Sequence, residues 1–329
     1  MRNHLSKPCL THVLNRLLSS PISVPHRSGR SLRTLAYEEL KSPPEKCHNF
    51  TAFILHGLLG SGRNWRFFSR SLASALLPAQ WRMVMVDLRN HGKSAEIEEL
   101  LPPHDLENAA KDLANLVKTE GWDWPDVVIG HSMGGKVALQ FAQSCANGDY
   151  GDSVHLPKQQ LWVLDSVPGT VNRKNGDGEV EKVLETLQSL PSTIPSRKWL
   201  VDHMLKLGFS KSLSEWIGSN LKQSGEEQTW AFNLEGAVQM FDSYRVTDYW
   251  PLLEHPPKGM EIAIVRAENS DRWDLDVIKQ LESLATTKRV DETEGKVSVH
   301  VLPNAGHWVH VDNPKGLLEI VAPKIASLS

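Results

Sequence analysis

The chain has 329 residues, an apolar fraction of 40% and a formal net charge of −3. This length fits one large α/β domain or a core with one insertion, and the small net charge argues against a nucleic-acid-binding surface. The longest apolar runs have the length of strands, well short of the roughly 18 residues of a membrane-spanning helix, so we expect no transmembrane segment and no nucleic-acid partner.

The first 33 residues differ in composition from the rest of the chain. They hold six basic residues and six serines but no acidic residue. A basic, serine-rich and acid-poor segment is typical of an organellar targeting sequence. We therefore expect residues 1–33 to direct the protein to a mitochondrion. A chloroplast is the alternative destination. The other interpretation is a basic tail with no targeting function.

Strand-like and helix-like segments alternate after this N-terminal stretch. Strands are predicted over residues 32–40, 50–57, 81–87, 126–130 and 160–165, and helices over residues 64–76, 104–121 and 135–144. Such alternation predicts an α/β fold with a mostly parallel central sheet covered by helices on both faces.

The alternation stops after Pro168. Residues 169–257 have helical periodicity and no convincing strand, after which strands resume at 259–267 and 296–302 and a helix closes the chain. A helical block between two strands of one sheet is typical of a cap. We expect this cap over a core formed by residues 34–168 and 258–329.

The stretch "GHSMG", residues 130–134, follows a predicted strand and precedes a predicted helix. A G-x-S-x-G motif in this context forms a strained strand-to-helix turn that exposes the serine hydroxyl. The glycines on either side leave room for neighbours packed against the turn, and the helix N-terminus favours developing negative charge. The motif therefore predicts Ser132 as a nucleophile.

A serine nucleophile needs a base and a pair of backbone amides that stabilise an oxyanion. His307, in "LPNAGHWVH" after the last predicted strand, is the expected base, whereas His310 is expected to be a packing or surface histidine. The amides of Met133 and Leu58 are the expected donors, because "LHGLLGSG" places a glycine-rich turn after an early strand. A phosphate cradle is the other interpretation of that turn, but the Lys-Ser/Thr pair of a P-loop is missing.

Four stretches of the sequence carry a family resemblance. "HGLLGS", "VDLRNHGKS", "GHSMGGK" and "NAGHWVH" stand in the order and spacing of an α/β-hydrolase, and the chain resembles this superfamily across essentially everything after residue 33. It is similar to the small-esterase branch that includes the abhydrolase domain-containing protein 11 group and related bacterial esterases. The resemblance implies a Ser-acid-His triad and an acyl-enzyme intermediate.

The acid of this triad has more than one candidate. Most members of the superfamily carry it after the strand that follows the cap, where this chain offers Asp271. In the branch that the chain resembles, that turn often reads Asn-Ser and an earlier aspartate serves, which corresponds here to Asp165 at the end of "LWVLD". We favour Asp165, with Asp271 as the alternative and Glu235 of the cap as the third candidate.

Other residues were assigned to the surroundings of the site. His56, Gly57, Trp230 and Phe232 are candidate substrate-binding residues, although the cap aromatics also fit packing between cap and core. In "DLRNHGKS" we expect Asp87 to tether the loop, and we interpret Arg89 and His91 as part of a solvated loop without a chemical role.

These residues together predict a serine hydrolase that cleaves carboxylic esters or thioesters of small acyl substrates. No cofactor is expected, since His307 alone activates the serine. No metal is expected either, because the cysteines lack the spacing of a metal site or a disulfide framework. Two alternatives remain open. One is a lyase of the same fold that would grip substrate carboxylates through Arg63 and Arg66, and the other is a ligand-binding receptor with an unused triad.

Overall fold

The computed structural model describes residues 34–42, 48–151, 160–171, 178–286 and 295–328. The expected targeting segment, residues 1–33, lies outside the described residues, as do Cys9 and Cys47. Cys145 is a buried free thiol.

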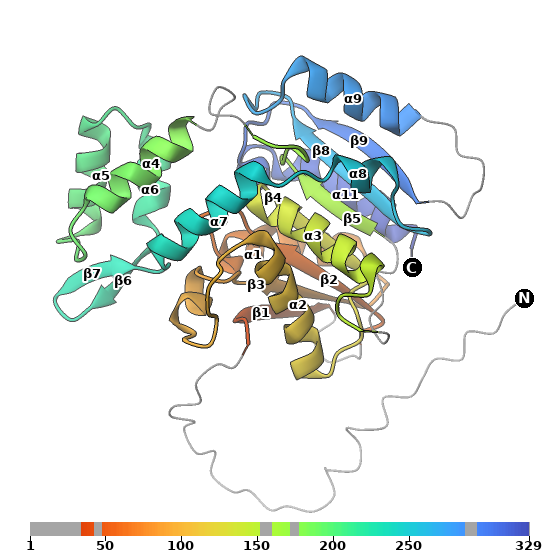
Figure 1. Cartoon of the computed structure of the whole chain (residues 1–329), viewed down its shortest axis with the longest axis horizontal. Coiled ribbons are helices and arrows are strands. Elements are labelled where there is room, and N and C mark those ends of the chain that lie inside the picture. The colour runs from red at the N-terminus through yellow and green to blue at the C-terminus, as the bar shows by residue number, and fades with distance from the viewer. Residues whose placement is uncertain (1–33, 43–47, 152–159, 172–177, 287–294, 329) are drawn as a thin grey trace, which may run out of the picture.

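A twisted sheet occupies the centre of the molecule (Figure 1). Within the described residues it has seven strands in the order β1-β3-β2-β4-β5-β8-β9. Only β1 runs antiparallel to its neighbour, and the other pairs are parallel. The strands are β1 (Tyr37–Ser42), β2 (Phe50–Leu55), β3 (Trp81–Val86), β4 (Val127–His131), β5 (Gln160–Leu164), β8 (Glu261–Ala267) and β9 (Lys296–Leu302). The predicted α/β fold with a mostly parallel sheet is confirmed.

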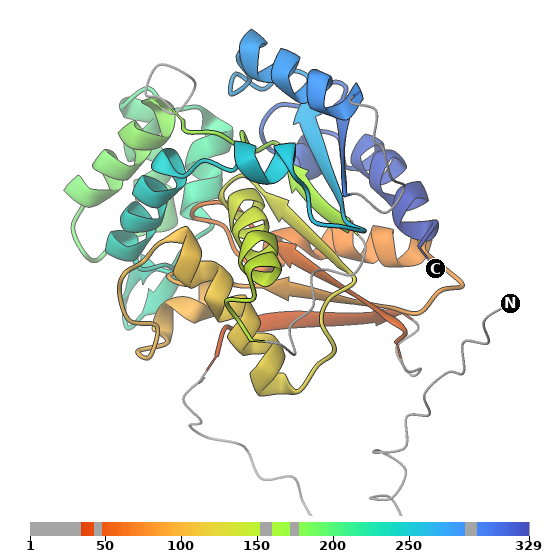
Figure 2. The same cartoon turned by 45° about the vertical axis from the view of Figure 1, so that its right-hand side comes forward.

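Helices cover both faces of the sheet (Figures 1 and 2). Their apolar sides pack on strands that are buried along nearly their whole length, as expected for parallel strands covered twice. One face carries α2 (Leu106–Glu120), α3 (Met133–Asn147) and α9 (Leu275–Thr286), and the other carries α1 (Arg66–Ala75) and α11 (Pro314–Ala326). Short helical turns, η1 (Gly62–Trp65), η2 (Gly92–Glu96) and α10 (Val309–Asp312), lie in the loops.

The segment between β5 and β8 folds mainly as helices beside the carboxyl ends of the strands (Figure 1). It contains α4 (Gly178–Ser189), α5 (Arg197–Lys206), α6 (Lys211–Gly218), α7 (Leu234–Val246) and α8 (Trp250–Glu254). The expectation that this segment has no strand was wrong. β6 (Leu221–Ser224) and β7 (Glu227–Trp230) form an antiparallel hairpin, with Gly225 at φ 63° in its two-residue turn.

A buried ammonium group links α3 to both ends of this cap. The Lys136 side chain is fully buried and donates hydrogen bonds to the backbone carbonyls of Gly169, Tyr244 and Thr247 at 2.7, 2.7 and 2.8 Å. Gly169 lies where the chain leaves the core, and the other two carbonyls lie at the end of α7. Because Lys136 is one helical turn after Ser132, the same helix fixes both the cap and the serine.

We expect the Lys136→Met variant to lose about 3 kcal/mol or more of unfolding free energy, because three buried carbonyls would lose a charged donor. Urea unfolding followed by circular dichroism measures this loss. Lys118→Met is the matched control, since the exposed ammonium of Lys118 bonds a single carbonyl, that of Tyr150, and a surface change costs about 0.5 kcal/mol or less. Equal losses in the two variants would contradict the linking role of Lys136.

Candidate active site

Ser132 occupies a strained turn between β4 and α3. Its backbone has φ 52° and ψ −123°, a conformation that few residues with a side chain adopt. The two motif glycines allow this turn to form. A β-carbon on Gly130 would lie 2.1 Å from the carbonyl oxygen of Gly134, and one on Gly134 would lie 2.5 Å from the carbonyl oxygen of His56. The local backbone therefore requires glycine at both positions.

Asp165 and His307 are joined by a hydrogen bond at the carboxyl ends of the strands. Asp165 follows β5 and is fully buried, and its Oδ2 lies 2.8 Å from Nδ1 of His307, which stands in the loop after β9. Three further donors hold the same carboxylate. They are the Ser270 hydroxyl at 2.7 Å, the Trp273 indole N–H at 2.6 Å and the Ala267 amide at 3.0 Å.

The electrostatic environment sets the charge of both groups. Burial by itself would raise the pKa of Asp165, but the hydrogen bonds from His307, Trp273 and Ala267 outweigh it and hold the pKa below its ordinary value. Burial and the nearby Arg272 guanidinium lower the pKa of His307 below its ordinary value of 6.5, against the opposing effect of Asp165. At neutral pH, Asp165 is a carboxylate and His307 is a neutral imidazole.

The other acid candidates do not bond the imidazole in the described part of the chain. Asp271 lies at the rim of the cavity with an exposed side chain, and Glu235 is exposed on α7 and does not line the cavity. His310 stacks on Trp65, with ring centroids 4.1 Å apart. Burial lowers the pKa of His310 to about 4, which fits a packing role.

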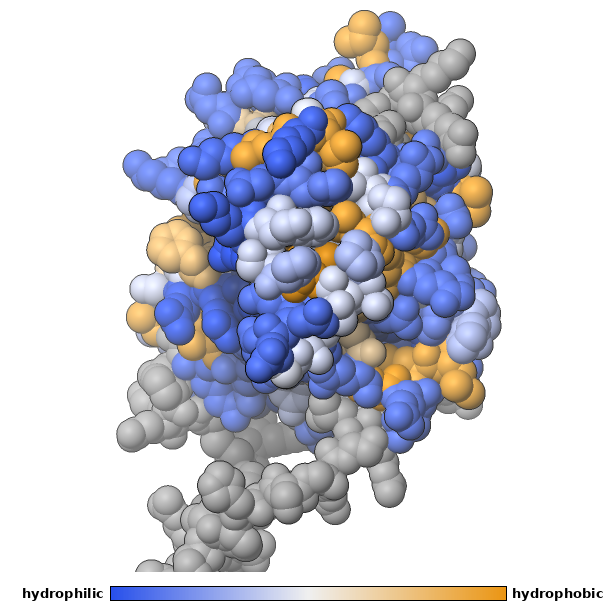
Figure 3. All heavy atoms as spheres, turned by 90° about the vertical axis from the view of Figure 1, so that its left-hand side faces the viewer, coloured by the Kyte–Doolittle hydropathy of each residue, from blue (hydrophilic) through white to orange (hydrophobic). Residues whose placement is uncertain are grey.

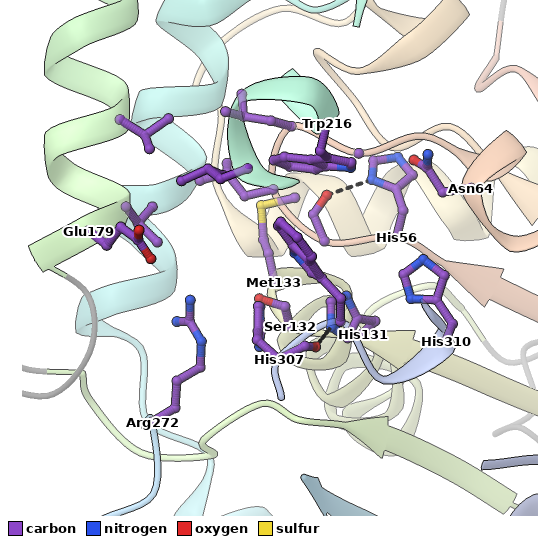
Figure 4. A pocket seen from close by; sticks show the side chains of 18 of the residues that line it. His56, Asn64, His131, Ser132, Met133, Glu179, Trp216, Arg272, His307 and His310 are labelled. Carbon is purple, nitrogen blue, oxygen red and sulfur yellow. Dashed lines mark hydrogen bonds between the residues drawn. The ribbon is translucent and has the colours of Figure 1, made fainter. Parts of the chain in front are cut away.

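The loop after β2 lies directly against the turn that carries Ser132. A β-carbon on Gly57 would be 3.1 Å from the Ser132 β-carbon, so this glycine permits the close approach. His56 Nδ1 donates to the Gly57 carbonyl (Figure 4). Among the described residues, neither the Leu58 nor the Met133 amide donates to another group of the protein, which leaves both N–H groups available to an oxyanion.

The interpretation of residues 89–91 as a solvated loop was wrong. Arg89 is 3% exposed and forms an ion pair with Asp112 at 2.7 Å. His91 is completely buried, and its Nε2 accepts a hydrogen bond from the Leu59 amide at 3.0 Å. The expected tether is present, since Asp87 accepts hydrogen bonds from the amides of Gly62 at 2.7 Å and Lys93 at 2.9 Å.

A cavity of about 320 Å³ opens above Ser132 and His307 (Figure 4). Its floor includes His56, Gly57 and the residues around the serine. The cap supplies an apolar wall made of Val180, Val183, Leu213, Trp216, Phe241 and Tyr244. The Trp216 ring meets that of Trp308 across the site, with centroids 5.8 Å apart. The rim carries charge from Glu179, Asp271, Arg272 and Asp312.

Four sequence-based candidates lie away from this cavity. Trp230 and Phe232 do not line it in the described part of the chain. Their rings stack on each other with centroids 5.1 Å apart, which favours packing between cap and core. Arg66 pairs with Glu38, and Arg63 bonds the Ser219 carbonyl. Neither arginine lines the cavity, which removes the residues on which the lyase hypothesis rested.

Sequence reasoning missed several residues that hold the site together. Ser270 and Trp273 donate to Asp165 from the same stretch of sequence that offered Asp271 as a candidate acid. His131, next to the nucleophile, donates from Nε2 to the His307 carbonyl at 2.8 Å. Burial holds the pKa of His131 well below its ordinary value, so the ring is neutral. No pattern in the sequence pointed to this contact.

Two further properties concern the described residues as a whole. Within the described ranges, His, Cys, Asp and Glu side chains form no group of three placed to hold a metal ion. In the same part of the chain, every helix is too short or too polar to cross a bilayer.

Comparison with known proteins identifies similar chains. The model of a family described as the alpha/beta hydrolase family matches residues 52–320. The sn-1-specific diacylglycerol lipase ABHD11 of Mus musculus is 26% identical over 277 residues, 83% of this chain and 80% of that protein. Human protein phosphatase methylesterase 1 is 27% identical over 305 residues, 82% of this chain and 74% of that protein. The fold of a marine microorganism esterase superimposes with a TM-score of 0.68 at 22% identity, covering 88% of this chain and 98% of that chain.

We expect the reaction of Ser132 with a fluorophosphonate to increase with pH and to reach half of its maximal rate below pH 6.5. A protonated imidazole cannot accept the serine proton, and the pKa of His307 lies below 6.5. The rate of labelling between pH 4 and 9, with Ser132→Ala as the unlabelled control, measures this dependence. A midpoint above pH 7 would contradict the charge assignment.

Proposed function

The chain belongs to the alpha/beta hydrolase family, and we propose that it hydrolyses carboxylic esters or thioesters of small acyl substrates through an acyl-enzyme on Ser132. The observation that carries the proposal is the hydrogen bond between Asp165 and His307 beside a cavity that contains Ser132. The relatives named above as a lipase and a methylesterase support the ester class.

In the first half of the proposed reaction, the Ser132 hydroxyl oxygen attacks the substrate carbonyl carbon and Nε2 of His307 accepts the hydroxyl proton. The carbonyl oxygen becomes an oxyanion, which the Leu58 and Met133 amides stabilise. Asp165 keeps the other imidazole proton on Nδ1 and stabilises the imidazolium. His307 then gives its proton to the departing alcohol or thiol as the bond to the acyl carbon breaks.

In the second half, water attacks the acyl-enzyme. His307 accepts a proton from that water, and the same amides stabilise the second oxyanion. Collapse of this intermediate returns the proton to the Ser132 oxygen and releases a carboxylic acid. One imidazole therefore acts in turn as base and acid, which requires that its ring stay at the orientation set by Asp165.

The walls of the cavity favour an acyl chain of limited size. Val183, Phe241 and Tyr244 of the cap are 2–4% exposed and line the cavity, so they present an apolar surface to the acyl group. The surface on the cap side of the molecule is mostly hydrophilic, with smaller apolar areas (Figure 3). These features support dissolved esters rather than an extended lipid surface as the source of substrate.

We expect the wild-type chain to hydrolyse p-nitrophenyl esters and the Ser132→Ala variant to lose about 10⁵-fold or more in kcat, because the covalent route disappears. Turnover is measured on esters from acetyl to palmitoyl and on a matched thioester series. Short and medium chains should be favoured because the cavity holds only about 320 Å³. Undetectable turnover and no fluorophosphonate adduct in folded wild-type protein would refute the hydrolase function and favour the receptor alternative.

Replacing each aspartate near His307 by asparagine distinguishes the two candidates for the acid. Asp165→Asn should lower kcat by about 10³- to 10⁴-fold, since the amide no longer holds the imidazole in the required tautomer. Asp271→Asn, at the exposed rim, should change kcat by less than about 3-fold. Both variants are assayed on the same ester, with thermal unfolding as the check on folding. The opposite ranking of the two losses would assign the acid to Asp271.

A further inference from the structure

The turn that carries the Leu58 amide has a conformation that its sequence disfavours. The Gly60 amide donates to the Gly57 carbonyl at 3.0 Å, which closes a four-residue turn around Leu58 and Leu59. Leu59 has φ 56°, whereas Leu58 is not among the residues with positive φ. These angles define a type II turn, whose third position is ordinarily glycine or asparagine. A leucine with its β-carbon is strained there.

His91 forms the hydrogen bond that this turn geometry requires. Its Nε2 lies 3.0 Å from the Leu59 amide, and its Nδ1 donates to the Arg89 carbonyl at 2.8 Å. The second bond places the ring proton on Nδ1, so the lone pair of Nε2 faces Leu59. Burial and the neighbouring His56 lower the pKa of His91 to about 3. The ring is therefore a neutral acceptor throughout the pH range in which the site is expected to work.

A change of turn type would relieve the backbone strain at Leu59. Rotation of the Leu58–Leu59 peptide by half a turn converts a type II turn into type I, in which the third residue has negative φ. That rotation carries the Leu59 N–H away from Nε2 of His91 and breaks the hydrogen bond. The Leu58 N–H belongs to the preceding Gly57–Leu58 peptide and does not turn with this rotation, but the turn that carries it then loses its hydrogen bond to His91.

We propose that His91 is a positioning residue: its hydrogen bond to the Leu59 amide anchors the strained turn and thereby keeps the Leu58 N–H, one residue earlier, in place beside Ser132. The inference rests on the proposed function, because the position of this amide matters only when a tetrahedral oxyanion forms at Ser132. An oxyanion donor acts on the transition state more than on the bound ester. Loss of the His91 acceptor should therefore appear in kcat and leave KM nearly unchanged.

The first test compares three substitutions at His91 by steady-state hydrolysis of the best ester of the panel. His91→Phe keeps an aromatic ring without an acceptor, and His91→Asn withdraws the acceptor from Leu59. Each should lower kcat by about 10- to 100-fold with KM within about 2-fold. His91→Gln, whose amide oxygen can reach the Leu59 amide, should recover most of the loss. Retention of more than a third of wild-type kcat by both the Phe and Asn variants would overturn the proposal.

The second test separates positioning from stability. Leu59→Ala and Leu59→Gly both remove the buried side chain, but only glycine adopts positive φ without strain. His91→Phe should therefore cost much less kcat in the Leu59→Gly chain than in the Leu59→Ala chain, with thermal unfolding recorded for all variants. Equal losses in the two chains, or losses that follow the unfolding temperature, would show that His91 has a structural role only.

The outcome also separates this inference from the function on which it rests. An inactive wild-type chain would refute the hydrolase proposal, and the positioning role would fail with it. An active wild-type chain whose Ser132→Ala variant is inactive, together with wild-type kcat in the His91 variants, would refute the positioning role alone.

Discussion

The contact of the Gly134 backbone with the end of β2 is the constraint on which the site depends. A β-carbon at Gly134 would lie 2.5 Å from the His56 carbonyl oxygen and 2.7 Å from that of Leu55. The first turn of α3 and the loop after β2 therefore meet backbone to backbone. This contact places Ser132 and the Leu58 amide, which belong to different elements, within one rigid unit. Any side chain at this position would separate them.

The second fixed unit of the site is assembled around a buried carboxylate. Asp165 leaves the sheet after β5. It accepts hydrogen bonds from Ala267 at the end of β8 and from Ser270 and Trp273 in the segment that follows. The imidazole of His307 then meets a carboxylate that is already held from two sides. The end of β8 and the turn after it thus bind and orient a carboxylate that comes from the neighbouring strand.

Much of the fold and part of the site could be predicted from the sequence. The runs of buried strand residues and the spacing of the G-x-S-x-G motif are local signals, and they indicated the parallel sheet and the turn at Ser132. The hairpin β6–β7 was missed because its strands are short and half-exposed, with no apolar alternation. Only Gly225 signalled a turn there. The helix α9 was not predicted, and Leu281 is its one fully buried residue among those described, so its apolar face is narrow.

The burial of His91 could not be predicted because its neighbours come from distant parts of the chain. Phe232 of the cap forms an antiparallel bridge with His91, and the Asn233 amide donates to the Asn90 carbonyl at 2.8 Å. The polar sequence "RNHGKS" resembles a solvated loop until the cap lies over it. Tertiary packing decided the role of this residue.

The three hydrogen bonds from Lys136 to the carbonyls of Gly169, Tyr244 and Thr247 affect how the cap can change in evolution. The cap leaves the core and returns to it beside a single side chain, so its two ends are anchored at one place. Substitutions in the cap that keep these carbonyls and the contact of Phe232 with His91 can reshape the cavity wall while the sheet below stays as it is. Substrate specificity can therefore change within the cap without a change in the core.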